Sequence, residues 1–426
     1  RKQAIKKLQR SNPYLWDMYT ESLRAIEASN NYVRNSGRNS KTNYGKTNLY
    51  ALFAEAMTQL AGKGRAGFIV PSGIATDNST RAYFDFLISK KRLESLYDFE
   101  NREGIFPSVH RSYKFCLLTL AQDVHEPCFL FFATRAEQLA DERRRFALTP
   151  EDIERINPNT RTAPIFRSNA DAELTKKMYG SVPVLLDESR GAEGNPWGIS
   201  FSQGLFNMTS ASGFLRTFEQ LDGAGAARKG LNWIDENGEV LVPLYEAKMV
   251  HQFDSRWATY QQDGNTVRDC TENEKRKSGY EPLPRYWVPQ KEVDRRLSAK
   301  EWNRQWLMGF RDITNATNER TVISSAIPRV GVGHTMPLYF LNPSFSPEHW
   351  LAFLSNMNSL VLDYVARQSV GGTHLTYNYL KQFPVLTPDQ YTKDDLRFLC
   401  VRAQELVYTT LGMRPFAEDL GFSGPP

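Results

Sequence analysis

The sequence predicts an α/β fold, because three short apolar runs and two helical segments follow one another between residues 48 and 120. The runs are Gly67–Val70, Leu93–Phe99 and Tyr113–Leu120, and each is short and nearly continuous in apolar side chains. Runs of this kind suit strands that are covered on both faces. A helical segment precedes the first run, and another separates it from the second. This order of elements is that of half an open α/β sheet.

The first helix is predicted from the spacing of its apolar side chains. They recur at i, i+3, i+4, i+7, i+8 and i+11, which places them on one face of a helix. Thr47 is the expected N-cap, and Gly62 or Gly64 lies beyond the end of the helix. The apolar positions are Leu49, Leu52, Phe53, Ala56, Met57 and Leu60.

The second helical segment returns the chain to the next strand. We expect Asp77 to cap it, and the aromatic and aliphatic residues between Tyr83 and Ile88 to form its apolar face. The strand, helix, strand unit from Gly67 to Phe99 should then be parallel and right-handed, as such crossovers almost always are.

The connection after this unit is too short for another crossover. Only residues 100 to 111 separate the strand Leu93–Phe99 from the strand Tyr113–Leu120, whereas a helical crossover needs a dozen residues or more. The last strand must therefore be antiparallel to its predecessor. The loop between them consequently lies at the carboxyl edge of the sheet, where open α/β sheets bind their ligands.

Phe106 lies in the middle of this loop and is followed by Pro107, which stiffens the chain. Two interpretations of Phe106 are open from the residues alone. It is either a hydrophobic plug that holds the loop on the sheet, or an exposed ring that stacks on a planar ligand such as an extruded base. The nearby His110, Arg111 and Lys114 are either contacts for that ligand or part of a solvated loop.

These segments resemble the second half of the gamma-class adenine-N6 DNA methyltransferases of restriction-modification and phage-defence systems, including the single-chain type IIG enzymes. The resemblance rests on Asn48–Phe53, Gly64–Pro71, Ile105–Pro107 and Lys114–Leu118, in that order and spacing. It implies the distal half of a Rossmann-like class I methyltransferase sheet. It also implies S-adenosyl-L-methionine as cofactor and double-stranded DNA as partner.

The resemblance also implies roles for individual residues. Phe106 would stack on the flipped adenine, and Phe53 would pack against the adenine ring of the cofactor. We place Tyr50, one helical turn before Phe53, in the same cofactor pocket. The methyl group would pass from the cofactor to adenine N6 without a metal or a covalent intermediate, because the cofactor supplies the reactive group.

Two motifs of that family do not occur in this sequence. One is the Gly-rich turn that binds the methionine end of the cofactor, and the other is an (Asp/Asn/Ser)-Pro-Pro-aromatic tetrapeptide. Ser11-Asn12-Pro13-Tyr14 lacks the second proline and follows a basic, helix-like run from Arg1 to Arg10, so we interpret it as a turn between helices. We therefore expect a C-terminal portion of a longer polypeptide, inactive alone, with the N-terminal remainder as its partner.

The composition sets broad limits. The chain has 426 residues, enough for two or three domains, and a net charge of +5, which is mild for a nucleic-acid binder. Its four cysteines have no metal-ligand spacing, and we predict no metal site from them. No apolar run reaches the length of a membrane span and no signal peptide is visible, so we expect a cytoplasmic protein without membrane contact.

The predicted organisation has five parts. Residues 1–45 form a basic helical or loop segment, and 46–133 form the C-terminal half of the methyltransferase domain, with Cys128–Phe132 closing its sheet. Residues 134–156 form a charged helical connector, with Thr149 to Asp152 starting a helix. Residues 157–390 form a mixed α+β target-recognition domain, and 391–426 a C-terminal helical segment.

The end of the chain also resembles the recognition domains attached to such methyltransferases. One long helix should start at Ser346-Pro347 and carry a buried stripe from Trp350 to Tyr364. A Gly-Gly turn at Gly371 and a strand around Tyr379–Val385 should follow. Candidate DNA contacts in this domain are Arg311, Arg320, Thr373 and His374, although surface salt bridges would explain the arginines equally well.

Three functions fit the sequence. The first is a site-specific adenine methyltransferase that works in restriction-modification or phage defence, with other defence subunits as candidate partners. The second is a DNA-specificity module without catalysis within a defence complex. The third is a nuclease that uses Glu246, Lys248, His251 and Asp254, whose spacing matches no defined metal motif.

Overall fold

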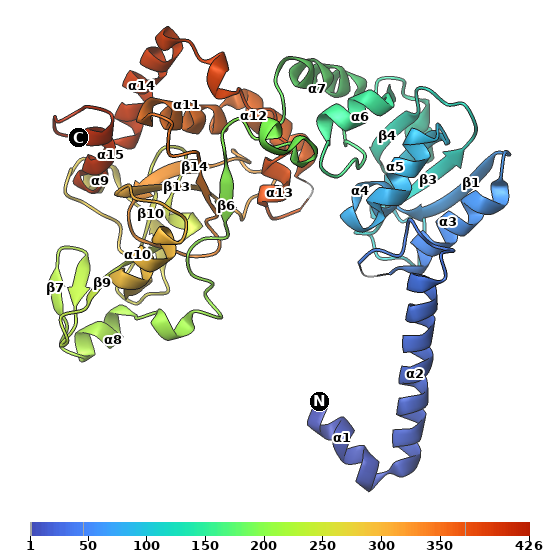
Figure 1. Ribbon diagram of the computed structural model, residues 1–426, viewed down its shortest axis with the longest axis horizontal. Coiled ribbons are helices and arrows are strands. Elements are labelled where there is room, and N and C mark those ends of the chain that lie inside the picture. The colour runs from blue at the N-terminus through green and yellow to red at the C-terminus, as the bar shows by residue number, and fades with distance from the viewer. Residues whose placement is uncertain (1, 46, 371) are drawn as a thin grey trace. The chain divides into compact units, whose positions relative to one another are not determined.

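The computed structural model describes residues 2–45, 47–370 and 372–426, so the predictions that concern Arg1 and Gly371 lie outside the described residues. The chain forms two compact units, Arg1–Lys176 and Lys177–Pro426 (Figure 1). The division falls within the helix Asn169–Ser181, beyond residue 157, where we placed the start of the recognition domain. Each unit is described separately below.

The first unit begins with two exposed helices and continues into a sheet flanked by helices. In Figure 1, α2 is the long helix that carries no buried side chain. Asn12 caps α2 and Pro13 is its first residue, so the predicted turn between two helices is confirmed. The helices are α1 (Lys2–Ser11), α2 (Pro13–Asn35), α3 (Leu49–Ala61), α4 (Gly73–Thr76), α5 (Arg81–Ser89), α6 (Pro150–Ile156) and α7 (Asn169–Ser181).

The sheet of the first unit has the strand order β1-β3-β2-β4-β5. β3 is antiparallel to both β1 and β2, so β1 and β2 run in the same direction with β3 between them. The predicted direction of all three strands is confirmed. The strands are β1 (Ala66–Pro71), β2 (Leu93–Glu100), β3 (Lys114–Leu120), β4 (Cys128–Ala133) and β5 (Phe146–Ala147).

Several local predictions in this unit were wrong. Asn48, and not Thr47, is the N-cap of α3, and Asp77 precedes a short 3-10 turn that leads into α5. β4 does not close the sheet, because β5 pairs with its other edge. The connector is helical only in a 3-10 turn, Ala136–Ala140, and in α6, where the Thr149 and Asp152 capping box is confirmed.

The buried face of α3 also differs from the predicted apolar stripe. The helix buries small and polar side chains, and its larger apolar residues Leu49, Phe53 and Leu60 are exposed among the described residues. Hydrogen bonds make this possible. Glu55 accepts from the Thr42 hydroxyl at 2.7 Å, and the Thr58 hydroxyl lies 2.7 Å from that of Tyr83 in α5. The residues that α3 buries are Ala51, Ala54, Glu55 and Thr58.

The second unit contains two larger sheets and one small one. The first has the order β12-β9-β8-β7, with β15 beside β9, the second has the order β14-β13-β16-β6, and β10 pairs with β11. Its strands are β6 (Ser200–Ser202), β7 (Ala227–Lys229), β8 (Asn232–Ile234), β9 (Val240–Tyr245), β10 (Ala258–Tyr260), β11 (Val267–Asp269), β12 (Tyr286–Pro289), β13 (Trp306–Phe310), β14 (Ser324–Pro328), β15 (Gly331–Val332) and β16 (Leu338–Phe340).

The helices of this unit include a pair where we predicted one long helix. The chain breaks at Asn358, whose side-chain amide bonds both the N–H and the carbonyl of Ser324, at 3.0 and 2.9 Å. Leu360 and Val361 are consequently exposed, although the stripe from Trp350 to Met357 is buried as predicted. The helices are α8 (Phe218–Gly223), α9 (Glu272–Lys275), α10 (Gln290–Ser298), α11 (Pro347–Met357), α12 (Leu360–Ser369), α13 (Tyr377–Leu380), α14 (Lys393–Val407) and α15 (Arg414–Asp419).

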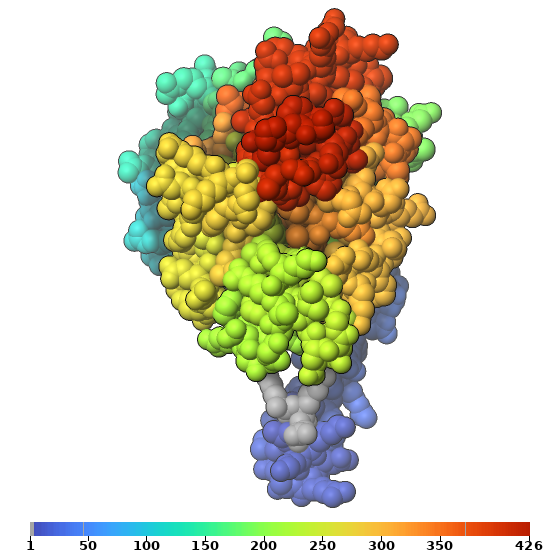
Figure 2. Space-filling model, turned by 90° about the vertical axis from the view of Figure 1, so that its left-hand side faces the viewer, coloured from blue at the N-terminus to red at the C-terminus, as the bar shows by residue number. Residues whose placement is uncertain are grey.

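Tyr379 belongs to α13, so the strand predicted around Tyr379–Val385 is reduced to one bridge between Pro384 and Val184. The C-terminal segment packs on the rest of the unit through Thr410 and Gly412, which both donate to Glu281. Figure 2 shows this segment in dark red beside the yellow segment. None of the helices in the described ranges combines the length and the apolar character that a membrane span requires.

Candidate functional site

The register of the first sheet brings several chain segments to one edge. Pro71 at the end of β1 and Phe99 near the end of β2 both pair with Phe115, at the start of β3. β4 is parallel to β2, and Ala133 at its end pairs with Phe99. The segment after β1, the loop after β2 and the end of β4 therefore meet at the same carboxyl edge, as we predicted for the loop that carries Phe106.

Phe106 is half-buried and rests on an aromatic ladder. Its ring meets that of Phe115 edge to face, with 4.9 Å between centroids, and Phe115 stacks on Phe99 at 5.3 Å. Phe99 belongs to the core of the unit. The ladder holds the ring at the edge of the sheet and leaves part of it accessible, which both interpretations of Phe106 require.

The backbone of the same loop is held by Asn101, which is fully buried. Its side-chain oxygen accepts from the N–H of Phe106 at 2.9 Å. Its side-chain nitrogen donates to the carbonyls of Phe106 and Val109, at 3.0 and 2.9 Å. Gly104 takes a left-handed conformation (φ 75°) that permits the turn before Phe106. The loop therefore has a defined conformation set from within.

The three basic residues of the loop have partners within the chain. Lys114 pairs with Glu100 at 3.1 Å, Arg111 donates to the carbonyl of Arg102 at 2.9 Å, and the His110 ring lies 2.8 Å from the Ser112 hydroxyl. All three are exposed. They lie at the carboxyl edge near Phe106, and their role in DNA binding stays a prediction.

Tyr50 of α3 lies beside the segment that follows β1. A Cβ on Gly73 would overlap the Asp77 carboxylate and lie 3.1 Å from the Tyr50 hydroxyl, so only glycine allows this close approach. Burial, and to a lesser degree the nearby Asp77 carboxylate, raises the pKa of Tyr50 to about 12. Its hydroxyl is therefore protonated at neutral pH and available as a hydrogen-bond donor.

Phe53 follows Tyr50 by one turn of α3 and is 63% exposed. Residues three apart on a helix face the same side, so the two aromatic rings are neighbours on one surface of α3. An exposed aromatic ring beside a polar hydroxyl suits the flat face and the polar edge of a purine. Tyr50 and Phe53 both belong to α3, and their role in cofactor binding stays a prediction.

Asp98 is a buried residue of this edge that the sequence did not single out. Its carboxylate accepts from the Ser72 hydroxyl, which follows β1, and from the N–H of Phe132 in β4 at 3.1 Å. Phe132 has a left-handed backbone (φ 61°), a conformation that non-glycine residues seldom adopt. Asp98 therefore ties the ends of β1, β2 and β4 together. Burial raises the pKa of this carboxyl above its ordinary value, although both hydrogen bonds oppose the shift.

We expect the variant Asp98→Asn to gain stability relative to the wild type as the pH rises through the acidic range. Because the pKa of Asp98 is raised in the folded state, the stability that its neutral form contributes is complete below the unfolded pKa. That contribution is lost as the pH rises through the folded pKa. Asparagine keeps the shape and stays neutral. Chemical denaturation of both proteins between pH 3 and 7, at roughly one-unit steps, measures the difference. A difference that is constant over this range would contradict the expectation.

In the second unit, three of the residues predicted to contact DNA have hydrogen-bond partners within the protein. The His374 ring lies 3.1 Å from the Asp312 carboxylate, and Thr373 accepts from the backbone of Thr314 at 3.1 Å. Arg311 is largely buried and donates to three carbonyls, those of Ala247, Lys248 and Val250. These bonds account for the position of Arg311 without DNA. Arg320 is half-buried in the loop between β13 and β14.

The polar side chains between Glu246 and Asp254 contact other residues of the protein. Glu246 accepts from the Tyr260 hydroxyl at 2.8 Å, and Asp254 pairs with Lys275 at 2.6 Å. The His251 ring lies against Trp257, and burial, followed by the charge of Arg311, lowers its pKa. Within the described ranges, no group of three or more His, Cys, Asp and Glu side chains could hold a metal ion. The geometry therefore does not favour the metal-dependent nuclease.

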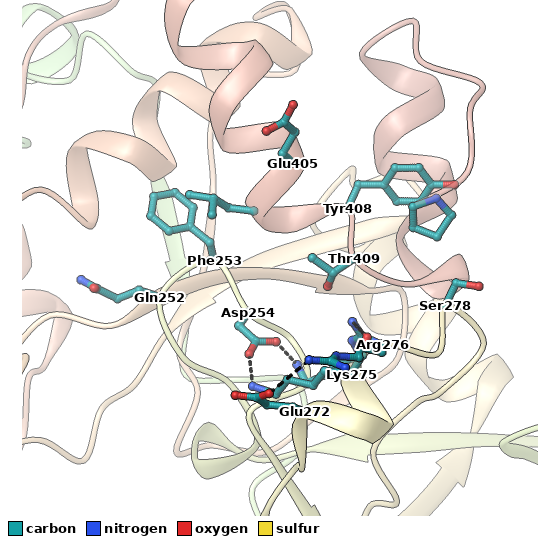
Figure 3. Close-up of a pocket in the computed structure, with 13 residues that line it drawn as sticks. Gln252, Phe253, Asp254, Glu272, Lys275, Arg276, Ser278, Glu405, Tyr408 and Thr409 are labelled. Carbon is teal, nitrogen blue, oxygen red and sulfur yellow. Dashed lines mark hydrogen bonds and ion pairs between the residues drawn. The ribbon is translucent and has the colours of Figure 1, made fainter.

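A surface pocket lies beside this cluster, between residues 252–254, α9 and the end of α14 (Figure 3). Four of its charged side chains pair with one another: Asp254 with Lys275, and Arg276 with Glu272 at 3.5 Å. The pocket therefore offers an incoming ligand little uncompensated charge at these positions, and the carboxyl edge of the first sheet is the better candidate site.

Comparison with known proteins gives a family for part of the chain. Residues 19–106, from within α2 to Phe106, match the model of the Eco57I restriction-modification methylases. Among solved structures, the type IIG restriction endonuclease BpuSI is similar, with 15% identity over 90% of this chain and a TM-score of 0.34. The type IIL restriction-modification enzyme MmeI, solved in complex with DNA, is similar with 12% identity over 88% and a TM-score of 0.37.

The chain spans about half the length of these two enzymes, 47% of BpuSI and 49% of MmeI. No curated protein sequence matches it. The matched segment ends at Phe106, so the family match covers Tyr50 and Phe53, the segment after β1 and the first half of the loop that Asn101 holds.

Proposed function

We propose that this chain is part of a DNA methyltransferase of the restriction-modification type, the family that residues 19–106 match. In this proposal the enzyme transfers a methyl group from S-adenosyl-L-methionine to the N6 atom of an adenine that is flipped out of the duplex. The observation that carries the proposal is the position of Phe106, which belongs to the matched segment. Its half-buried ring lies at the carboxyl edge of the sheet, on a loop of defined conformation.

The cofactor pocket would have one wall on α3. The exposed ring of Phe53 offers an apolar face for the adenine ring of the cofactor, and the protonated hydroxyl of Tyr50 can donate a hydrogen bond to its polar edge. S-adenosyl-L-methionine supplies the methyl group when bound. Phe53 and Tyr50 would orient the cofactor at the same edge to which the Phe106 loop delivers the base.

Phe106 would hold the extruded adenine by stacking, a contact that every base can make through its π face. The rim of His110, Arg111 and Lys114 would contact the phosphates of the target strand, because such contacts dominate affinity for DNA. Lys114 is exposed and pairs with the largely buried Glu100, which Arg102 also pairs with, so Glu100 would keep a partner if Lys114 turned to a phosphate.

A further polypeptide segment would complete the site, and we propose the N-terminal remainder of the same polypeptide. β1 lies at the end of the strand order and pairs, among the described residues, with β3 alone. Ile69 of β1 is 53% exposed, and the adjacent α3 presents Leu49 and Leu60 to solvent. An unpaired strand edge beside exposed apolar side chains is a surface that another strand and its helix would cover.

The second unit would read the DNA sequence. Arg320 lies between β13 and β14, and Thr373 and His374 lie between α12 and α13, where His374 forms a bridge with Ile313. These are the residues that we propose for contacts with bases or phosphates. We propose that the protein acts in the cytoplasm, in restriction-modification or phage defence. Other defence subunits are candidate partners. A specificity module without catalysis is the alternative outcome of the experiment below.

Sequencing of methylated bases in DNA from cells that express the full-length gene tests the proposed function. We expect N6-methyladenine at one recurring sequence, and its loss in cells that express Phe106→Ala. Methylation at cytosine would contradict the adenine specificity. DNA without modified bases, together with sequence-specific binding by the purified protein, would indicate the specificity module instead.

We expect Phe53→Ala to raise the KM for S-adenosyl-L-methionine roughly 3- to 10-fold, the amount that loss of one aromatic contact of about 1 kcal/mol predicts. Leu60→Ala is the matched control, because Leu60 lies on the same face of α3 and is 86% exposed, two turns beyond Phe53. Initial rates of methyl transfer at varied cofactor concentration measure both variants. An equal increase in KM in the two variants would assign Phe53 to packing and not to the cofactor.

A further inference from the structure

We propose that Asn101 is a positioning residue for base flipping, acting through Phe106; this inference rests on the proposed function. Asn101 is the first residue after β2 and has no solvent exposure. Its amide occupies both backbone groups of Phe106, the N–H at 2.9 Å and the carbonyl at 3.0 Å. A side chain that bonds both groups of one residue fixes the φ and ψ angles on either side of its Cα, and hence the direction of the Phe106 side chain.

Two further bonds place Asn101 itself. Its third side-chain bond goes to the carbonyl of Val109 at 2.9 Å, on the far side of the loop. Its own N–H donates to the carbonyl of Tyr113 at 3.0 Å, just before β3 begins. Asn101 therefore joins the start, the middle and the end of the loop, and its bonds need both the donor and the acceptor of an amide.

The outer face of the loop has separate supports. Glu103 accepts from Thr134 at 3.0 Å and pairs with Arg135, and Arg111 donates to Arg102 at 2.9 Å. These contacts tie the loop to the end of β4 and close it at its base, but they do not touch Phe106. Loss of Asn101 should therefore leave the loop attached to the sheet while it frees the backbone at Phe106.

The consequence concerns the orientation of the ring. Phe106 contacts Phe115 by an edge-to-face geometry, in which a small rotation of the backbone changes the face presented to a base. Misplacement of a reacting group by about 1 Å can lower a rate roughly 100-fold. We therefore expect Asn101 to contribute to kcat and to base flipping, and to leave the KM for the cofactor unchanged.

The test uses Asn101→Leu and Asn101→Asp in the full-length protein. Leucine has a similar volume and removes all three bonds, whereas aspartate keeps the acceptor for the Phe106 N–H and loses the donor to the two carbonyls. We expect both variants to lower kcat roughly 10- to 100-fold and to reduce the fluorescence rise of 2-aminopurine at the target position. The KM for S-adenosyl-L-methionine should not change.

Asn195→Leu is the matched control, because it also removes an asparagine side chain that hydrogen-bonds the backbone of a loop. Asn195 makes the same pair of bonds to one residue, the N–H and carbonyl of Ile199 at 2.8 and 3.1 Å, and it belongs to the second unit. It should lower the melting temperature without changing the 2-aminopurine signal. An equal loss of signal in Asn195→Leu would assign the effect of Asn101→Leu to general destabilisation and overturn the proposal.

A double-mutant cycle separates positioning from a merely structural role. If Asn101 acts through Phe106, Asn101→Leu should have no further effect on base flipping in a protein that already carries Phe106→Ala. The proposal is overturned if Asn101→Leu lowers the signal by the same factor in both backgrounds, or if it leaves the signal of the wild type unchanged.

Amide hydrogen exchange tests the positioning without DNA. The Phe106 N–H is protected by the Asn101 side chain, so we expect faster exchange at Phe106 in Asn101→Leu and near-normal exchange in Asn101→Asp. Unchanged exchange at Phe106 in Asn101→Leu would overturn the proposal. A wild-type protein that neither methylates DNA nor raises 2-aminopurine fluorescence would refute the proposed function, and exchange would still decide whether Asn101 positions Phe106.

Discussion

Replacement of Phe106 by alanine is expected to lower kcat/KM for methyl transfer roughly 10- to 100-fold, since stacking on an aromatic side chain contributes about 1–3 kcal/mol per base. Phe106 is only half-buried, and its main ring contact is the edge-to-face one with Phe115. The fold should therefore tolerate the change, with a modest fall in melting temperature. Methyl transfer to a DNA duplex with a single target adenine measures the rate, and 2-aminopurine at the target position reports flipping.

Phe106→Trp is the informative control for this prediction. The larger aromatic ring of tryptophan still offers a face on which the base can stack. Base flipping should therefore be retained in the Phe106→Trp variant and lost in the Phe106→Ala variant. If alanine destabilises the protein but keeps the wild-type rise in 2-aminopurine fluorescence, Phe106 is a hydrophobic plug. The two interpretations that the residues left open are separated by this pair of variants.

The variant Asp363→Ala is expected to lower the free energy of unfolding of the second unit by roughly 3–5 kcal/mol, the usual effect of removing one partner of a buried ion pair. Asp363 is buried in α12 and accepts from the N–H groups of Thr321 and Val322 at 2.7 and 2.8 Å. It also pairs with Arg367 at 2.8 Å. Alanine leaves two buried N–H groups without an acceptor and the guanidinium without its carboxylate.

Urea denaturation followed by tryptophan fluorescence measures this effect, since the core of the second unit is rich in tryptophan. Asp395→Ala is the control. Asp395 also accepts a backbone N–H, that of Thr392 at 3.0 Å, but it is exposed at the start of α14, so its loss should cost much less than the loss of Asp363. Equal losses in the two variants would contradict the importance of burial at Asp363.

The same ion pair also holds a loop that we propose for contacts with DNA. Arg367 donates to the carbonyls of Ala316 and Glu319, in the loop that carries Arg320. Asp363 and Arg367 therefore hold this loop on α12. The sequence pattern assigned no role to Asp363, because a buried acidic residue in a helix looks the same in sequence as an exposed one.

The structure also revised which face of α3 is buried. The spacing of its apolar residues correctly predicted a helix, but the helix buries the opposite side, where Glu55 and Thr58 find hydrogen-bond partners. Periodicity shows that one face is apolar, and it does not show which neighbour covers that face. The exposed apolar stripe is informative for this reason, since it is the surface that we propose a further polypeptide segment covers.

The sequence by itself determined the relative directions of β1, β2 and β3 and the place of Phe106 on the carboxyl edge of the sheet. Both follow from chain length, because a connection of about ten residues forces an antiparallel strand. Only the tertiary structure decided what holds Phe106 there. The amide of Asn101 reaches across the loop to Phe106 and Val109, and Asp98 joins three strand ends. Such bonds link groups through space, and their partners are set by folding and not by local sequence pattern.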